Sequence, residues 1–196
     1  MKDPSAIYDA AWFVKDFDHP GVKQDFFLIA NALMRQFQPK YVYDYGCGPG
    51  MIIERLGAMG AFVTGFEGSV HGKAHADPSV QHCIEVADLT TMEPQSRTVD
   101  SGGLVICTEV AEHLEAQHAA HLVELLCAHM SPIVFTAAPP GQGGHDHVNE
   151  QPKEYWLELF AKHGALIDQD ATHECRARWQ AVTVLHHMHK NVMVIR

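Results

Sequence analysis

The stretch VYDYGCGPGMIIERL, residues 42–56, decides the fold class of this chain. Residues 41–46 are aromatic and β-branched, which predicts a buried strand, and residues 51–60 predict a short helix that ends at Gly60. The glycines between them let backbone N–H groups approach a ligand, and they expose a helix N-terminus that favours a carboxylate or phosphate. A strand, a glycine-rich turn and a helix in this order indicate a β-α-β unit with a ligand at its turn.

Outward from this stretch, apolar strands alternate with amphipathic helices. Strands are predicted over residues 61–68, 82–89, 103–110, 132–138 and 191–196, and helices over residues 22–37, 114–130 and 153–163. Residues 139–152 are rich in Gly and Pro and predict a long loop. The alternation predicts an α/β fold, with parallel strands and helices on both faces of the sheet. Ligands of such sheets bind at the carboxyl ends of the strands.

The length and composition fit one globular domain. The chain has 196 residues, of which 46% are hydrophobic and 19% charged, so a disordered chain is excluded. We expect a single domain over residues 1–196, with an N-terminal arm or lid over 1–20 and a core over 22–196. The net charge of −10 disfavours a general nucleic-acid binder or a protein of anionic membranes.

The cysteines and the N-terminus predict a cellular location. The five cysteines are far apart and form no CxxC pair, which favours a reducing compartment. The first ten residues contain no apolar signal segment, and no apolar run approaches the ~20 residues of a membrane helix. We therefore expect a soluble, cytoplasmic protein; the sequence does not indicate an oligomeric state.

Two carboxylates follow the next two predicted strands. Glu67 ends the second strand, 17 residues after Gly50, where a carboxylate can accept both hydroxyls of a ribose. Asp88 ends the third strand and could receive an adenine amino group. The turn reads GxGxG with Asp44 two residues ahead of it, whereas the phosphate turns of dinucleotide-binding proteins normally read GxGxxG.

These motifs together resemble the class I S-adenosylmethionine-dependent methyltransferases. VYDYGCGPGMIIERL is similar to their first motif, FVTGFEGS to the second-strand motif, VADL to the adenine-side motif and ICTEVAEHL to the fourth-strand motif. The resemblance implies a Rossmann-like, mostly parallel sheet of seven strands, one of them antiparallel. It also implies a set of cofactor-binding residues: Asp44, Gly46, Cys47, Gly48, Gly50, Glu67, Asp88, Leu89 and Thr108.

A cluster of carboxylates and histidines follows the fourth strand. If a helix starts at Thr108, then Glu109, Glu112 and His113 share one face of it, and the loop sequence His145-Asp146-His147 lies at the same edge. Carboxylates with imidazoles suit Mg²⁺, Mn²⁺ or Fe²⁺. The pattern resembles the ubiquinone-pathway O-methyltransferases and the small-RNA 2'-O-methyltransferases. That resemblance implies a metal bound by Glu109, Glu112, His113 and His147.

The same histidines also fit a mechanism without metal. A methyl acceptor must lose a proton, and an imidazole with a pKa near ~6.5 suits a general base. His145, His147 and His113 are the candidates, and Asn149 is a candidate for orienting the acceptor. The histidines of the tail, such as His187, are expected to be solvated. Tyr8 and Trp12 either cover the cofactor or pack on the sheet edge.

The sequence thus predicts an S-adenosylmethionine-dependent methyltransferase with a small-molecule substrate. Oxygen is the expected acceptor atom, because residues 108–111 read Thr-Glu-Val-Ala instead of an Asn-Pro-Pro-Tyr or Asp-Pro-Pro-Tyr motif. Two alternatives stay open. One is a metal-dependent 2'-O-methyltransferase of a nucleoside or RNA end, and the other is a non-catalytic S-adenosylmethionine-binding module.

Overall fold

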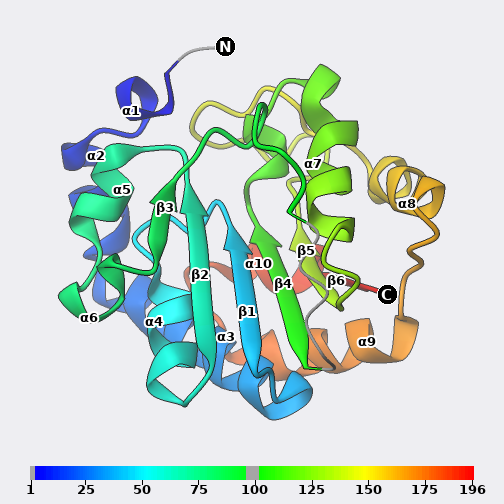
Figure 1. Ribbon diagram of the computed structural model, residues 1–196, viewed down its shortest axis with the longest axis horizontal. Coiled ribbons are helices and arrows are strands. Elements are labelled where there is room, and N and C mark those ends of the chain that lie inside the picture. The colour runs from blue at the N-terminus through cyan, green and yellow to red at the C-terminus, as the bar shows by residue number, and fades with distance from the viewer. Residues whose placement is uncertain (1–2, 96–101) are drawn as a thin grey trace.

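The computed structural model describes residues 3–95 and 102–196, and its centre is a twisted sheet (Figure 1). The strand order is β3-β2-β1-β4-β5-β6, and all neighbours are parallel except β6, which runs antiparallel to β5. The strands are β1 (Tyr41–Tyr45), β2 (Phe62–Glu67), β3 (Ile84–Val86), β4 (Gly103–Thr108), β5 (Ile133–Thr136) and β6 (Met193–Ile195). The predicted mostly parallel α/β sheet is confirmed.

Helices cover both faces of the sheet. One face packs against α3, α4, α9 and α10, and the other packs against α7 and α8. The helices are α1 (Pro4–Ile7), α2 (Ala10–Phe17), α3 (Pro20–Phe37), α4 (Met51–Ala58), α5 (Val70–His75), α6 (Pro78–Gln81), α7 (Ala119–Cys127), α8 (Lys153–Lys162), α9 (Gln169–Arg178) and α10 (His186–Asn191).

The central strands are mostly apolar because both of their faces are buried. In β4, Leu104 and Ile106 point into the core beside α3 and α4, whereas Val105 and Cys107 point into the core beside α7. Alternate residues of a strand face opposite sides of a sheet, so neither side can be polar here. The polar side chains follow the strands, at their carboxyl ends.

The expected seventh strand is not formed within residues 3–95 and 102–196. Next to β6 the chain makes a single antiparallel bridge between Ile167 and Ile195, with backbone hydrogen bonds between Leu166 and Arg196. Immediately afterwards, Asp168 accepts a hydrogen bond from the N–H of Ala171 and caps α9. The chain turns into a helix before it can extend the strand, so the sheet described has six strands.

The helix predicted over residues 114–130 is shorter than expected. Its α-helical part is α7, and two 3₁₀ turns, Ala111–His113 and Ala116–His118, precede it. Glu109 has a φ of 54°, which ends β4 with a left-handed residue and prevents a helix from starting at Thr108. The predicted common helical face of Glu109, Glu112 and His113 is therefore wrong.

Within the two described ranges, none of the helices combines the length and the apolar character needed to cross a lipid bilayer.

Candidate functional site

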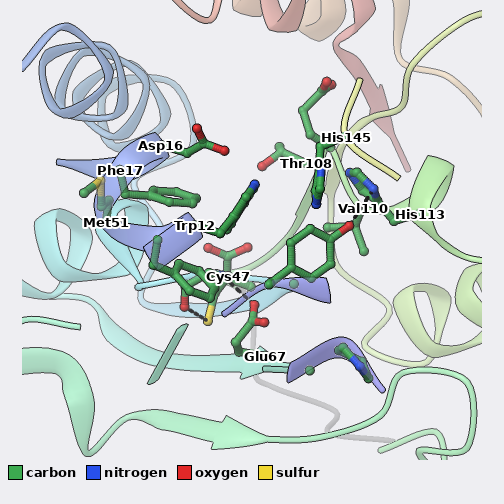
Figure 2. Close-up of a pocket in the computed structure, with 18 of the residues that line it drawn as sticks. Trp12, Asp16, Phe17, Cys47, Met51, Glu67, Thr108, Val110, His113 and His145 are labelled. Carbon is green, nitrogen blue, oxygen red and sulfur yellow. Dashed lines mark hydrogen bonds between the residues drawn. The ribbon is translucent and has the colours of Figure 1, made fainter. Parts of the chain in front are cut away.

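A cavity of about 520 Å³ lies at the carboxyl ends of the strands (Figure 2). Its volume is in the range of small-molecule and cofactor sites. Gly50 and Glu112 do not line the cavity, although the residues that follow them in the sequence, Met51 and His113, do. The other residues predicted to bind a cofactor, to ligate a metal or to act as a base all line it: Asp44, Gly46, Cys47, Gly48, Glu67, Asp88, Leu89, Thr108, Glu109, His113, His145 and His147.

The glycine-rich turn forms one side of this cavity. Gly46, Gly48 and Gly50 all have positive φ values, and Gly50 begins α4. A Cβ atom at Gly46 would collide with the side chain of Val110. The N–H groups of Gly46 and Cys47 both donate to the carbonyl of Phe66, which ties the turn to the end of β2.

Glu67 lies at that strand end, and its carboxylate is buried. Oε2 accepts a hydrogen bond of 2.8 Å from the N–H of Gly48, and Oε1 accepts one of 2.8 Å from the N–H of Ser69. Burial raises the pKa of this carboxyl group, while the backbone donors oppose that rise. Each oxygen has a second lone pair, so the carboxylate can also accept hydroxyl donors from a ligand.

Two further acids lie on the same side. Asp44 is buried at the end of β1, and burial together with the nearby charge of Glu67 raises its pKa to about 8. Asp88 is exposed, and its Oδ1 accepts hydrogen bonds from the N–H (2.9 Å) and the hydroxyl (2.7 Å) of Thr90. We call this side of the cavity, residues 44–50, Glu67 and residues 88–89, the cofactor side.

The opposite side contains a cluster of one carboxylate and two imidazoles. The ligand atoms of Glu112, His113 and His147 all lie within 4.8 Å of one another. Glu112 is buried; its Oε1 accepts a hydrogen bond from the N–H of Ala138 (3.2 Å), whereas its Oε2 has no hydrogen-bond partner. Burial and the charge of Glu109 raise the pKa of Glu112 to about 8.

The two imidazoles of this cluster are chemically suited to bind a cation. Burial, followed by the proximity of His147, lowers the pKa of His113 to about 4, so His113 is neutral at physiological pH. A neutral imidazole and a buried carboxylate oxygen that lacks a donor are ligands that a divalent transition metal takes. Three of the four predicted metal ligands therefore lie together and suit a divalent metal, whereas Glu109 is not in this group and pairs with His187 instead.

The sequence analysis missed Glu150, which orients one of these histidines. Its Oε1 lies 2.9 Å from Nδ1 of His147, and its two oxygens accept hydrogen bonds of 2.7 Å from the N–H groups of Gly141 and Gly143. This carboxylate therefore fixes both the ring and the loop that carries it. The spacing His-x-x-Glu was the available signal. Asn149, predicted to face an acceptor, is instead buried and bonded to Gln151.

The N-terminal arm, residues 3–17, contributes to this side as well. The hydroxyl of Tyr8 lies 2.8 Å from Nδ1 of His113, and the Trp12 ring stacks on the His145 ring with centroids 6.1 Å apart (Figure 2). The Tyr8 carbonyl accepts a hydrogen bond from the Ser69 hydroxyl (2.7 Å), just beyond Glu67. The arm thus spans the cavity from the cofactor side to the histidines.

The C-terminal segment, residues 182–191, forms part of the cavity wall. The sequence did not predict this position for the segment. His187, expected to be solvated, lines the cavity, and its Nε2 lies 3.1 Å from Oε2 of Glu109. The segment folds back because the buried carboxylate of Asp25 accepts hydrogen bonds from the N–H groups of Thr183, Val184 and Leu185. We call the arm, residues 109–113, residues 145–150 and this segment the acceptor side.

Comparison with curated proteins identifies two related O-methyltransferases. The chain is 26% identical over 127 residues to the ubiquinone biosynthesis O-methyltransferase of Aeromonas salmonicida, covering 62% of this chain and 48% of that protein. The match to the Neisseria meningitidis enzyme of the same name is 29% over 126 residues, covering 59% and 47%. The chain therefore spans about half the length of these relatives. No protein-family profile matches it.

Two solved methyltransferase structures have the same fold. The Synechocystis magnesium protoporphyrin IX methyltransferase with bound S-adenosylmethionine superposes with a TM-score of 0.62 and 17% identity, covering 97% of this chain and 86% of that one. A putative methyltransferase of Haloferax volcanii, in complex with its Trm112 activator, has a TM-score of 0.66 and 12% identity, covering 100% and 97%.

The fold and the relatives agree with the motifs. The chain has the Rossmann-like fold of the class I S-adenosylmethionine-dependent methyltransferases, and its curated homologues are O-methyltransferases. The resemblance stated from the sequence is confirmed at this level.

Proposed function

We propose that this protein transfers a methyl group from S-adenosylmethionine to an oxygen atom of a small molecule. The observation that carries the proposal is that two sets of groups line the same cavity. The glycine-rich turn and Glu67 lie on one side of it, and imidazoles and carboxylates lie on the other. The homology to O-methyltransferases supports oxygen as the acceptor atom.

The cofactor side supplies the groups that the cofactor needs. Backbone N–H groups at the start of α4 suit the carboxylate of the amino acid part, and Glu67 suits the ribose hydroxyls. Glu67 suits the positive charge of the sulfonium and ammonium groups, and Asp44, whose pKa is about 8 without ligand, can ionise beside these groups. Asp88 is placed for the adenine end.

The acceptor side supplies the base and the exclusion of water. In the reaction the S–CH₃ bond breaks while an O–CH₃ bond forms in line with it, and the hydroxyl proton goes to a base. Glu150 orients His147 as a carboxylate orients the base of a catalytic dyad, so His147 is the proposed base. The aromatic rings of Tyr8 and Trp12 line the cavity and suit a flat, hydroxylated acceptor.

Calorimetric titration with S-adenosylhomocysteine, followed by turnover assays, tests the proposal. The acceptor panel contains phenol, catechol, benzyl alcohol, 1-octanol and a short oligoribonucleotide. We expect S-adenosylhomocysteine to bind and at least one hydroxylated compound to be methylated. No binding at millimolar S-adenosylhomocysteine would contradict the whole proposal. Binding without turnover of any compound would favour a non-catalytic module, and methylation of the oligoribonucleotide alone would favour the 2'-O-methyltransferase.

A metal is a second proposal for the same cavity, favoured by the partnerless Oε2 of buried Glu112 beside His113 and His147. A bound divalent cation would lower the pKa of an acceptor hydroxyl. Electron paramagnetic resonance titration with Mn²⁺ should show a site that Glu112→Gln weakens and that Glu115→Gln, an exposed control, leaves intact. Full turnover by protein shown to be metal-free by elemental analysis would reject the metal and leave the histidine-base mechanism.

We also propose that the protein works in a reducing compartment such as the cytoplasm. The five cysteines are all free thiols, and burial raises the pKa of Cys107 and Cys175, which keeps those two groups protonated.

A further inference from the structure

Glu109 has a strained backbone at the edge where the ligand is expected. Its φ of 54° lies in the left-handed region, which residues other than glycine rarely adopt. The conformation is held by Thr136, whose hydroxyl and carbonyl oxygens both accept from the N–H of Glu109, at 2.9 and 3.3 Å. The turn directs the Glu109 side chain to the acceptor side of the cavity.

One oxygen of this carboxylate is fixed by the C-terminal segment. Oε2 of Glu109 lies 3.1 Å from Nε2 of His187 and accepts a hydrogen bond of 3.4 Å from the side chain of Gln142. Gln142 in turn accepts a hydrogen bond of 2.8 Å from the side chain of Asn191, at the end of α10. Both partners of Oε2 thus depend on where α10 is docked.

The other oxygen is left for a ligand. Oε1 of Glu109 is buried and has no hydrogen-bond partner, and the same is true of Oε2 of Glu112. The two carboxyl groups are close enough to act on each other, since Glu109 raises the pKa of Glu112. Glu109 lines the cavity whereas Glu112 does not, and a buried carboxylate oxygen without a donor costs free energy, so the free oxygen of Glu109 is the one placed to accept a donor from a ligand.

We propose that His187 is a positioning residue, which holds the Glu109 carboxylate so that its free oxygen, on the wall of the cavity, receives the acceptor hydroxyl. This inference rests on the proposed methyl transfer. It makes the C-terminal segment part of the machinery for the acceptor, although the cofactor contacts do not involve it. The group that touches the acceptor is Glu109, and His187 acts only through it.

Three variants test this role. His187→Leu removes the donor, His187→Gln keeps a donor, and the control His173→Leu makes the same change at an exposed position of α9, outside the cavity. With the panel compound that the wild type methylates fastest, we expect His187→Leu to lower kcat by about 10- to 100-fold, the cost of a misplaced group. The KM and the affinity for S-adenosylhomocysteine should change by less than about threefold, and His187→Gln should recover most of kcat.

A second measurement does not depend on any acceptor. The thermal shifts of His187→Leu, Glu109→Gln and the double variant should be non-additive, because the two side chains are in contact. Additive shifts, or a kcat of His187→Leu equal to that of the wild type, would overturn the inference. Failure of the wild type to bind S-adenosylhomocysteine would instead contradict the proposed function, and it would be seen before any variant is made.

Discussion

The two sides of the cavity are built in different ways. The cofactor side comes from the ends of three adjacent strands, within residues 44–89, and its main contacts involve backbone groups of the glycine-rich turn. The acceptor side comes from four separate segments, from Tyr8 in the arm to His187 in α10, and its contacts join side chains. The cofactor side accepts few substitutions, because its contacts depend on the backbone of the turn. The acceptor side is made from side chains on four segments, so single substitutions can change its specificity.

The largest effect is expected from Gly46→Ala, which should destroy the cofactor side. The new Cβ would collide with Val110 and force a side chain into a positive φ, so the variant should lose about 1–3 kcal/mol of stability and all measurable S-adenosylhomocysteine binding. Gly57→Ala is the control, because its Cβ meets Val63 at 3.5 Å and lies inside a helix, where alanine is favoured. Equal calorimetric titrations for both variants would contradict the role of the turn.

Glu67→Ala should weaken the cofactor side without touching the acceptor side. Loss of a charge-assisted contact to the ribose costs about 1.5–3 kcal/mol, or roughly 10- to 150-fold in affinity for S-adenosylhomocysteine. The exposed Glu85→Ala on β3 should bind like the wild type. Unchanged calorimetric affinity in Glu67→Ala would remove Glu67 from the site.

Asp25→Asn should do the reverse and disturb the acceptor side alone. An amide cannot accept all the hydrogen bonds that hold residues 183–185, so stability should fall by about 1–3 kcal/mol and turnover should drop several-fold. The S-adenosylhomocysteine affinity should stay within about twofold, because Asp25 lies outside the cofactor side. A matched Asp170→Asn change, at an exposed position of α9, should alter neither quantity. A parallel loss of cofactor affinity in Asp25→Asn would show that the two sides are not separable.

A further effect concerns pH on the cofactor side. Without ligand the pKa of Asp44 is about 8, and the ammonium group of S-adenosylhomocysteine favours the ionised form. The affinity for S-adenosylhomocysteine should therefore rise from pH 6 to pH 8, by at most about tenfold per pH unit, and level off above pH 8. Asp44→Asn should flatten this profile, as measured by calorimetry in two buffers of different ionisation enthalpy. A wild-type profile that is already flat would contradict the assignment.

The raised pKa of Asp44 has the opposite effect on the stability of the ligand-free protein, which falls as the pH rises. A carboxyl group whose pKa is raised on folding contributes stability at low pH, and that contribution is lost as the pH rises from about 4 to about 8. Asp44→Asn should therefore raise the melting temperature of the ligand-free protein at pH 8 and leave it nearly unchanged at pH 4.

This contrast also explains what the sequence could predict. Strand β1, the glycine-rich turn and Glu67 follow one another closely, so their residue types and spacing predicted the strands, the turn and the lining of the cofactor side. Which of these residues bind the cofactor stays a prediction.

On the acceptor side, local pattern was not sufficient. Tyr8 and His113 are 105 positions apart, and no spacing relates Glu109 to His187. The left-handed backbone of Glu109 was also invisible, because the residue types predicted a strand that continues to residue 110, and no glycine marks the turn. The prediction of a seventh strand was wrong for a similar reason, since the helix cap at Asp168 competes with extension of the strand.

The contact between Glu109 and His187 can form only late in the synthesis of the chain. The ribosome needs about 4–16 s to extend the chain from Glu109 to His187, at about 5–20 residues per second. Throughout that interval the glycine-rich turn and β1 to β4 have already been synthesised, but the partner of Glu109 has not. The acceptor side, unlike the segments of the cofactor side, is therefore complete only after the last turns of the chain have been made.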